Sequence, residues 1–476
     1  MRLLIVLFAA SVLGGCLSEQ KGTVGLTGGV DTTTSDTGSP ADTTPSDTAL
    51  TDTGDTSPIV CEVVEFDYMT YAAPAEVTPF EYHHRSDGFT VVGGRVLIES
   101  QVTDPETGNR GVGIYAYAHG ADVKILTTGD ASNRLLDASG TRILVARRDT
   151  AGTVYPTTDT LVVVGDSGET TIAGGLHIQG SPGISGYTGD AGRMLSDRIV
   201  AWRDCLPTAD GHDCDTLRLM VSVDGGAATA VAQVARDGYL GLVGPDVQGQ
   251  AVVWAERASA GEPWEIKLLE GGNTRLVATS PTLIGDRAVP RIAGSRIYWS
   301  TETDVRSALL DGSQVAELTV VREGPCRLTD VAGARVVLLC GEGGFLINGY
   351  FSVGSQVVLV DEVGVASLVE AGPGLASPRI SDRWVAWLSY PTVDIGCADF
   401  ENGEVRVAPV ATPSVVKTLA PVGVGCLCCG AFWPVPHIDV DGDLVAWNYG
   451  DPPEEGGPGG SGLGYAVLAP DIFCPD

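Results

Sequence analysis

A hairpin signature recurs eight times along the chain, and it constrains the fold more than any other feature of the sequence. Each copy is a short apolar strand, a turn of two or three residues, and an alternating apolar strand that often ends in an aromatic residue. The first apolar residues after the turns are Val96, Ile143, Ile199, Ala251, Ile297, Val336, Trp384 and Leu444. They recur at an average interval of about 50 residues, which is typical of repeat proteins whose units cover one another's apolar faces.

A second pair of alternating strands follows most copies, as in residues 113–129 and 356–372. No stretch shows the sustained 3.6-residue apolar period of a helix. Four strands in each repeat match one blade of a β-propeller, so the sequence predicts an all-β propeller of seven or eight four-stranded blades. A pair of β-sandwiches or a β-helix is the competing fold.

The third, fifth, seventh and eighth copies carry the clearest form of the signature. The seventh reads Pro-Arg-Ile-Ser-Asp-Arg-Trp-Val-Ala-Trp from Pro378 to Trp387. This hairpin resembles the P-x-I-S-x-D-x-x-I-A-W-like motif that recurs in each blade of TolB-type propellers, which implies the same fold for the whole repeated domain. The first, second and sixth copies depart from the motif, which leaves the choice between seven and eight blades open.

The first sixteen residues have the order of a secretory signal. Arg2 precedes an apolar run from Leu3 to Leu13. This run is too short to span a bilayer, which takes about 20 residues. Leu13-Gly14-Gly15-Cys16 resembles the lipobox of bacterial lipoproteins, which implies removal of a signal peptide 1–15 and lipidation of Cys16. Leu17 after that cysteine implies sorting to the outer membrane, facing the periplasm or the cell surface. The alternative is an ordinary signal with a chance cysteine.

A change in composition separates this signal from the repeats. Residues 21–60 are rich in Thr, Asp, Ser, Gly and Pro and contain almost no large apolar side chain. Such a segment buries too little surface to offset the entropy of ordering it. The sequence therefore predicts a lipid-anchored, disordered Thr/Asp-rich tether over 16–60, followed by the propeller domain over 61–476.

The charge balance excludes two classes of partner. Asp and Glu outnumber Lys and Arg by 60 to 29, which gives a net charge of −31. Nucleic-acid binding needs clustered cations, and so does docking on anionic lipids through a basic patch. We expect no nucleic-acid partner, and membrane contact only through the lipid anchor.

Ten cysteines remain beside Cys16, an even number that indicates up to five disulfides in an exported chain. Cys326 and Cys340 lie directly opposite each other if the sixth hairpin turns at Gly333. Cys205 and Cys214 bracket a polar loop, and a Cys61–Cys474 bridge would lock the closure of a ring. The remaining cysteines favour two disulfides with nearby loops, with a metal site as the alternative, and they are Cys397, Cys426, Cys428 and Cys429.

No catalytic or cofactor motif is recognisable. The chain lacks H-E-x-x-H, G-x-S-x-G, a Walker loop and a G-x-G-x-x-G after a strand. Asp439, Asp441 and Asp443 alternate with Val and Gly as in a calcium loop, but they align with the hairpin turns of the other copies, where Asp and Gly serve turn geometry. We therefore expect no cofactor, with Ca²⁺ at these three carboxylates as the alternative.

The periodic tryptophans allow two interpretations. Trp202, Trp254, Trp299, Trp387 and Trp447 end the repeated strand. They are expected to pack between blades rather than to stack on sugars.

The functional hypothesis is a non-catalytic binding module at the cell envelope whose partner is an envelope protein or glycan. The alternatives are an exported propeller hydrolase or lyase that acts on polysaccharide, and a structural subunit of an envelope complex. Catalytic propeller residues are brought together in space rather than in sequence, so the missing motif does not decide between these readings.

Overall fold

The chain folds into antiparallel sheets, and no helix occurs among the residues that this computed structural model describes. The described residues are 68–69, 89–103, 110–118, 124–127, 131–149, 159–176, 192–207, 214–235, 241–259, 261–283, 289–301, 303–318, 324–341, 345–346, 351–390, 392–394, 399–426, 437–450 and 461–468. Residues 59–476 form one compact unit. The predicted signal peptide, Cys16 and the tether lie outside the described residues.

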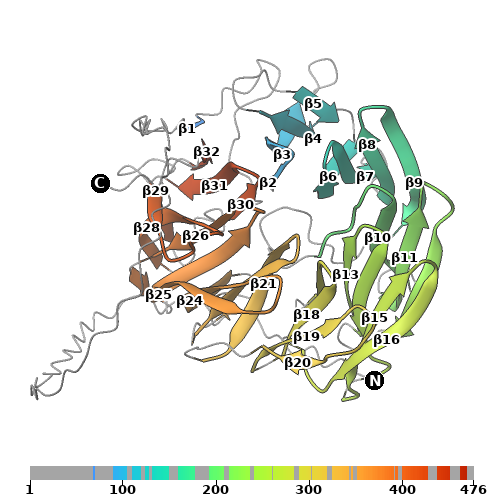
Figure 1. Ribbon diagram of the computed structural model, residues 1–476. Coiled ribbons are helices and arrows are strands. Elements are labelled where there is room, and N and C mark those ends of the chain that lie inside the picture. Colours follow the sequence, from blue (N-terminus) through green and yellow to red (C-terminus); the bar gives the residue numbers. More distant parts are fainter. Residues whose placement is uncertain are drawn as a thin grey trace, which may run out of the picture. The chain divides into compact units, whose positions relative to one another are not determined.

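Each of the eight sequence copies, here called repeats 1 to 8, begins a group of strands (Figure 1). Repeat 1 has β2 (Phe89–Val92), β3 (Arg95–Thr103), β4 (Arg110–Tyr117) and β5 (Lys124–Thr127). Repeat 2 has β6 (Ala131–Ser139), β7 (Arg142–Asp149), β8 (Asp159–Gly165) and β9 (Gly168–Leu176). Repeat 3 has β10 (Ile199–Pro207), β11 (Cys214–Val223) and β12 (Thr229–Ala235). Repeat 4 has β13 (Leu242–Gln248), β14 (Ala251–Glu256), β15 (Trp264–Glu270) and β16 (Asn273–Ser280).

The second half of the chain continues the pattern. Repeat 5 has β17 (Arg291–Ala293), β18 (Arg296–Ser300), β19 (Val305–Leu309) and β20 (Ala316–Glu317). Repeat 6 has β21 (Cys326–Ala332), β22 (Arg335–Cys340), β23 (Phe345–Leu346) and β24 (Phe351–Val360). The long strand β25 (Ala366–Ile380) ends repeat 6 and begins repeat 7, which has β26 (Trp384–Ser389), β27 (Thr392–Asp394), β28 (Asp399–Pro409) and β29 (Lys417–Cys426). Repeat 8 has β30 (Ile438–Asp441), β31 (Leu444–Gly450) and β32 (Ser461–Val467).

The predicted hairpins are present, with one reduced. The first and second strands pair antiparallel in seven repeats, for example Val92 with Arg95 and Asp441 with Leu444. In repeat 3 only a single bridge, Leu195 to Val200, stands in place of the first strand. The Ser196 hydroxyl accepts the N–H of Ile199 at 3.1 Å in this turn, as the Ser381 hydroxyl accepts the N–H of Trp384 at 3.1 Å in repeat 7.

The first strands of successive repeats follow one another around a ring. Strand β13 contacts β17, β17 contacts β21, and β21 contacts β25. Strand β25 contacts β30, β30 contacts β2, and β2 contacts β6. The short N-terminal strand β1 (Tyr68–Met69) pairs antiparallel with β32, so the first and last parts of the domain share a sheet. This arrangement is a β-propeller, and the all-β prediction is confirmed.

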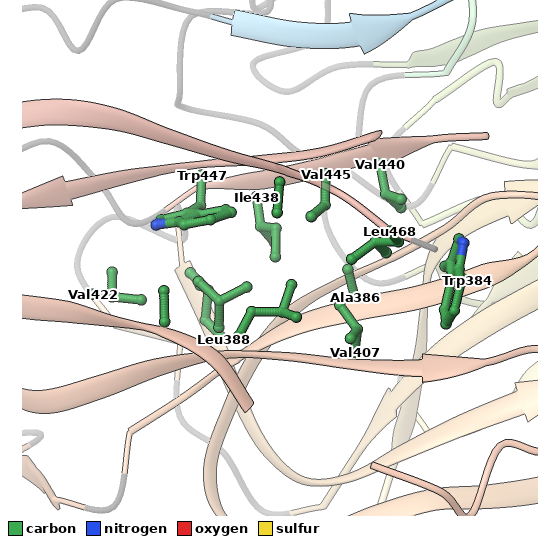
Figure 2. Close-up of a cluster of buried hydrophobic side chains, with 14 of the residues drawn as sticks. Trp384, Ala386, Leu388, Val407, Val422, Ile438, Val440, Val445, Trp447 and Leu468 are labelled. Atoms are coloured by element: carbon green, nitrogen blue, oxygen red, sulfur yellow. The ribbon is translucent and has the colours of Figure 1, made fainter. Parts of the chain in front are cut away.

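The core lies between the repeats. Trp202, Trp254, Trp299, Trp387 and Trp447 are all fully buried. Each belongs to a cluster with side chains of the preceding repeat; Trp447 shares its cluster with Leu388 and Val422. In Figure 2 the indole of Trp447 lies in the layer of apolar side chains that fills this interface. The prediction that the tryptophans pack between repeats is confirmed.

Candidate functional site: a ring of alternating charges on the first strands

Polar residues occupy equivalent places at or near the first strand of every repeat. In order from repeat 1 to repeat 8 they are Thr90, Asp137, Arg193, Asp246, Arg291, Asp330, Arg379 and Asp439. Even-numbered repeats carry an aspartate, and odd-numbered repeats carry an arginine except for repeat 1. We call these eight residues the charged ring. Perturbed ionisable groups near the middle of a fold are candidates for a functional site.

Each aspartate of the charged ring accepts a backbone hydrogen bond from the next repeat. Asp137 accepts the N–H of Leu195 at 2.7 Å, and Asp246 accepts the N–H of Ile292 at 2.7 Å. Asp330 accepts the N–H of Ile380 at 3.0 Å, and Asp439 accepts the N–H of Val91 at 2.8 Å. The four carboxylates therefore join repeats 2 to 3, 4 to 5, 6 to 7 and 8 to 1.

Two arginines converge on the most buried of these carboxylates. Arg193 donates to both oxygens of Asp246, at 2.9 and 2.7 Å, and Arg291 donates to Asp246 Oδ1 at 3.3 Å. Burial of Asp246 would raise its pKa, but the two guanidiniums outweigh that effect and hold the pKa below its ordinary value. This carboxylate is ionised at neutral pH and links repeats 3, 4 and 5.

The third arginine bonds to backbone oxygens on both sides. Arg379 donates from Nε to the carbonyl of Ile438 at 3.3 Å and from Nη1 to the carbonyl of Thr329 at 3.2 Å. Its guanidinium therefore bridges repeats 6 and 8 across repeat 7.

Repeat 1 interrupts the alternation of charges, and the carboxylates of the two neighbouring repeats, Asp137 and Asp439, have raised pKa values. Thr90 stands where an arginine would complete the pattern, and its hydroxyl donates to Asp439 at 2.6 Å. Within the described residues, neither Asp137 nor Asp439 forms an ion pair. Burial raises the pKa of each to about 6, although N–H donors and a nearby arginine oppose the shift.

A half-buried histidine lies at the same place in the ring. The His437 ring meets Phe89 edge to face, with the centroids 4.7 Å apart. Burial lowers the pKa of His437 to about 3, and the charge of Arg379 acts in the same direction. The imidazole is therefore neutral at the boundary between repeats 8 and 1.

The carboxylate oxygens at this boundary already have protein partners. Asp439 Oδ2 accepts from Thr90 and Val91, and Oδ1 accepts the N–H of Val440 at 3.0 Å. Asp137 is similarly placed, with Oδ2 facing the N–H groups of Met194 and Leu195 and Oδ1 accepting the N–H of Ala138 at 2.7 Å. A general acid has to present its proton to a ligand, so these bonds favour a structural use of both groups.

The three carboxylates proposed for Ca²⁺ bond to two different segments, the first hairpin of repeat 1 and the start of β26 in repeat 7. Asp439 faces Val91, Asp441 accepts the N–H of Gly93 at 2.6 Å, and Asp443 accepts from Trp384 Nε1 at 2.9 Å. In the part of the chain that the structure describes, no three His, Cys, Asp or Glu side chains group as a metal site would require. Calcium binding stays a prediction.

One disulfide joins described cysteines. Cys326 and Cys340 are bonded across the first hairpin of repeat 6, with Cα atoms 4.0 Å apart, as the register of that hairpin predicts. Cys205 is also disulfide-bonded. The side chains of the other predicted cysteines, Cys61, Cys214, Cys397, Cys426, Cys428, Cys429 and Cys474, lie outside the described residues, and their pairings stay predictions.

The sequence carried a signal for the charged ring that the hairpin alignment did not use. Asp246, Arg291, Asp330 and Arg379 occupy neighbouring columns just before the turn, but their charges alternate in sign. In an alignment of single repeats such a column is variable. In an alignment of pairs of repeats, the alternation of aspartate and arginine would be visible.

The chain is similar to several solved structures at low sequence identity. No family model matches the chain, and no curated protein matches it either. Solved structures with a similar fold include the Pyrococcus horikoshii acylaminoacyl peptidase, with 10% identity over 80% of this chain and 52% of that chain at a TM-score of 0.42. This chain thus spans about half the length of that peptidase.

Two other solved structures are similar to the chain, and one of them is a β-propeller domain. The β-propeller domain of the Trilobed protease from Pyrococcus furiosus has 9% identity over 77% of this chain and 90% of its own, at a TM-score of 0.39. TolB from Acinetobacter baumannii has 14% identity over 69% and 80%, at a TM-score of 0.33. At these identities the likeness concerns the fold alone.

No helix among the described residues is long and apolar enough to cross a bilayer.

Proposed function

We propose that this chain is an exported, lipid-anchored β-propeller of eight blades that acts as a non-catalytic binding module at the cell envelope. Eight repeat hairpins support the blade number, with Leu195 and Val200 forming the reduced third one. The lipobox-like segment ending at Cys16 supports the anchor, and Leu17 supports the outer membrane as its place, facing the periplasm or the cell surface. The partner is an envelope protein or glycan.

The non-catalytic role is supported by the charged ring, whose side chains bond to neighbouring repeats. The carboxylates of Asp137, Asp246, Asp330 and Asp439 each accept at least one N–H from the next repeat. Arg291 lies within ion-pair distance of carboxylates in repeats 4 and 6, and Arg379 donates to carbonyls of repeats 6 and 8. These groups hold a rigid frame, and a rigid frame that presents loops is a common basis of binding proteins.

The two ends of the repeats differ in a way that suits this role. The first and second strands are joined by turns of two or three residues, such as Gly93–Gly94, where φ is +59° and +72°. The second and third strands are joined at the opposite end by longer connections, including 104–109, 150–158, 208–213 and 451–460. The disulfide between Cys326 and Cys340 lies at this opposite end.

An exported hydrolase or lyase acting on polysaccharide is the second candidate function. It is favoured by Asp137 and Asp439, whose pKa values of about 6 would suit proton transfer near neutral pH.

Turnover separates the two candidates. The purified protein is incubated with a panel of envelope and extracellular polysaccharides, and reducing ends and unsaturated products are measured. The binding module predicts no turnover. Turnover that disappears in Asp137→Asn or Asp439→Asn, while the variants remain folded, would establish the enzyme instead.

The anchor is tested separately. Cells expressing wild type or Cys16→Ser are labelled with a clickable palmitate analogue and fractionated. We expect label and outer-membrane recovery for wild type, and loss of both for the variant. An unlabelled wild type would overturn the lipid anchor and leave the propeller itself unaffected.

A further inference from the structure

Exposed apolar side chains collect at one end of the repeats. In repeats 6 and 7 the short strands β23 and β27 lie off the main path of the sheet, so the third and fourth strands are β24 and β25, and β28 and β29. The large apolar side chains that remain exposed in the described residues lie in or close to the turns between third and fourth strands, and they are Val223, Leu276, Val315, Val363, Val365, Leu368, Val415 and Val467. Single exposed apolar residues are ordinary on a protein surface. Five of these residues, however, fall on the turns of the three successive repeats 5, 6 and 7.

The three turns lie side by side. Leu318, close to Val315, shares a buried cluster with Val360 of repeat 6, and Ala366 packs against the same cluster. Val416, next to Val415, packs against the cluster that contains Val369 of repeat 6. We name the exposed residues of these turns the apolar rim, which consists of Val315, Val363, Val365, Leu368 and Val415.

The central turn of the apolar rim is held in place by its own hydrogen bonds. Asp361 Oδ1 accepts the N–H of Val363 at 3.0 Å and that of Val365 at 2.8 Å. The backbone N–H of Asp361 also donates to the carbonyl of Val365 at 3.0 Å. Val363 is 75% exposed and Val365 58% exposed. A turn fixed in this way presents its apolar side chains with little ordering entropy left to lose on binding.

The charge around the apolar rim indicates which class of partner it fits. Residues 311–318, 361–368 and 411–418 contain the acids Asp311, Glu317, Asp361 and Glu362 and the cation Lys417, and Arg275 of repeat 4, which donates to the carbonyl of Leu310 at 2.7 Å, lies beside Asp311. Acids therefore outnumber cations at these turns. A second copy of the chain would bring the same acids together, and an anionic lipid surface would be repelled. A protein segment that combines lysine or arginine with apolar side chains matches both the charge and the apolar area.

We propose that the apolar rim is the docking surface for a protein segment in which cationic and apolar side chains alternate. This inference rests on the proposed binding function and names the class of partner: the envelope protein rather than the glycan. Apolar side chains of the partner cover the exposed valines, and its cations lie beside the acids of the turns.

The first test uses a defined probe. A fluorescent peptide of alternating lysine and leucine is titrated with the purified full-length protein, and binding is followed by anisotropy. We expect Val363→Ser/Val365→Ser to weaken binding by about tenfold or more. The matched control is Val223→Ser, because Val223 is 48% exposed at the corresponding end of repeat 3, where Arg198 neutralises Asp224.

Two further comparisons make this test decisive. Replacing lysine by glutamate in the peptide is expected to abolish binding, because the rim is acidic. Equal binding by the double variant and wild type, or an equal loss in the Val223 control, would overturn the apolar rim. Both substitutions are exposed, and unchanged thermal unfolding of each variant verifies that it is folded.

The second test identifies the occupant in cells. A photoreactive amino acid replaces Val363, or Val223 as the control, and the adducts are mapped to peptides by mass spectrometry. We expect an adduct from position 363 alone, on a protein segment rich in Lys or Arg and apolar residues. No adduct at 363, an adduct with lipid or with a second copy, or equal adducts from both positions would refute the rim. Polysaccharide turnover, by contrast, would refute the proposed binding function, so the two failures are distinguishable.

Discussion

Asp439 in the last repeat accepts hydrogen bonds from Thr90 Oγ1 at 2.6 Å and from the N–H of Val91 at 2.8 Å, both in the first repeat. Asp439 and Thr90 are 349 positions apart in the sequence. The contact lies where β30 meets β2, and there the ring of first strands closes. The same type of bond joins repeats 2 to 3, 4 to 5 and 6 to 7, so closure uses an interaction that the chain repeats at every second interface.

Asp439→Ala is therefore expected to destabilise the domain. It leaves the N–H groups of Val91 and Val440 and the hydroxyl of Thr90 without their acceptor, and each buried orphan costs about 1–3 kcal/mol. We expect a loss of about 2–4 kcal/mol in the free energy of unfolding, measured by urea denaturation.

A double-mutant cycle assigns part of this loss to the closure. Thr90→Val removes one donor to Asp439, and the coupling between the two substitutions should be about 1 kcal/mol. Strictly additive effects would show that the contact does not contribute to stability.

Asp246→Leu tests the charged ring at its most buried point. The carboxylate is fully buried and accepts from Arg193 and Arg291. Its removal takes the ion-pair partner from Arg193 and leaves Arg291 only the longer contact with Asp330, at 3.9 Å. Breaking a buried ion pair from one side is expected to lower the unfolding free energy by about 3–5 kcal/mol.

The control is an ion pair in full contact with water. Asp224→Asn breaks the pair with Arg198, both partners of which are exposed. We expect no measurable change in its urea midpoint, because exposed pairs contribute little. If both variants unfolded at the wild-type midpoint, the charged ring would have no role in stability.

The hairpins and the packing of the tryptophans could be predicted from the sequence, whereas the charged ring was missed. A two-residue turn and an alternating strand are local, so the period of the apolar positions reveals them. The pairing of Asp137 with the next repeat depends on which first strands become neighbours, and no local pattern encodes that. The apolar rim was missed for a related reason, because Val363 and Val91 look alike in sequence, and only their exposure, 75% and 6%, distinguishes them.

The disulfide of repeat 6 gives a further prediction. Cys326 and Cys340 are 14 residues apart in the sequence, and a cross-link of that length stabilises a protein by about 3 kcal/mol through loss of entropy in the unfolded chain. Cys326→Ser/Cys340→Ser is expected to lower the unfolding free energy by about that amount. The measurement is urea denaturation under oxidising conditions, and under these conditions an unchanged midpoint would contradict the prediction.

The stability of the domain should depend on pH through three half-buried groups, Asp137, Asp439 and His437. Burial raises the pKa of Asp137 and Asp439 from 3.8 to about 6, so between pH 4 and 6 the folded state binds more protons than the unfolded state at these two sites. Their contribution to stability is complete below about pH 4 and is lost as the pH rises through 6. Burial lowers the pKa of His437 from 6.5 to about 3, so the unfolded state binds the extra proton there, and stability rises with pH.

In wild type the two aspartates act against the single histidine. Together the three groups lower the unfolding free energy by about 1.4 kcal/mol for each unit by which the pH rises between 4 and 6. Urea titrations at several pH values in this range, each compared with wild type, separate the contributions. His437→Gln removes the opposing group, so the three-site slope should become about twice as steep. Asp137→Asn/Asp439→Asn leaves the histidine alone, and the sign of that slope should reverse. If the unfolding free energies of all three proteins changed in parallel with pH, these three groups would not be the origin of the dependence.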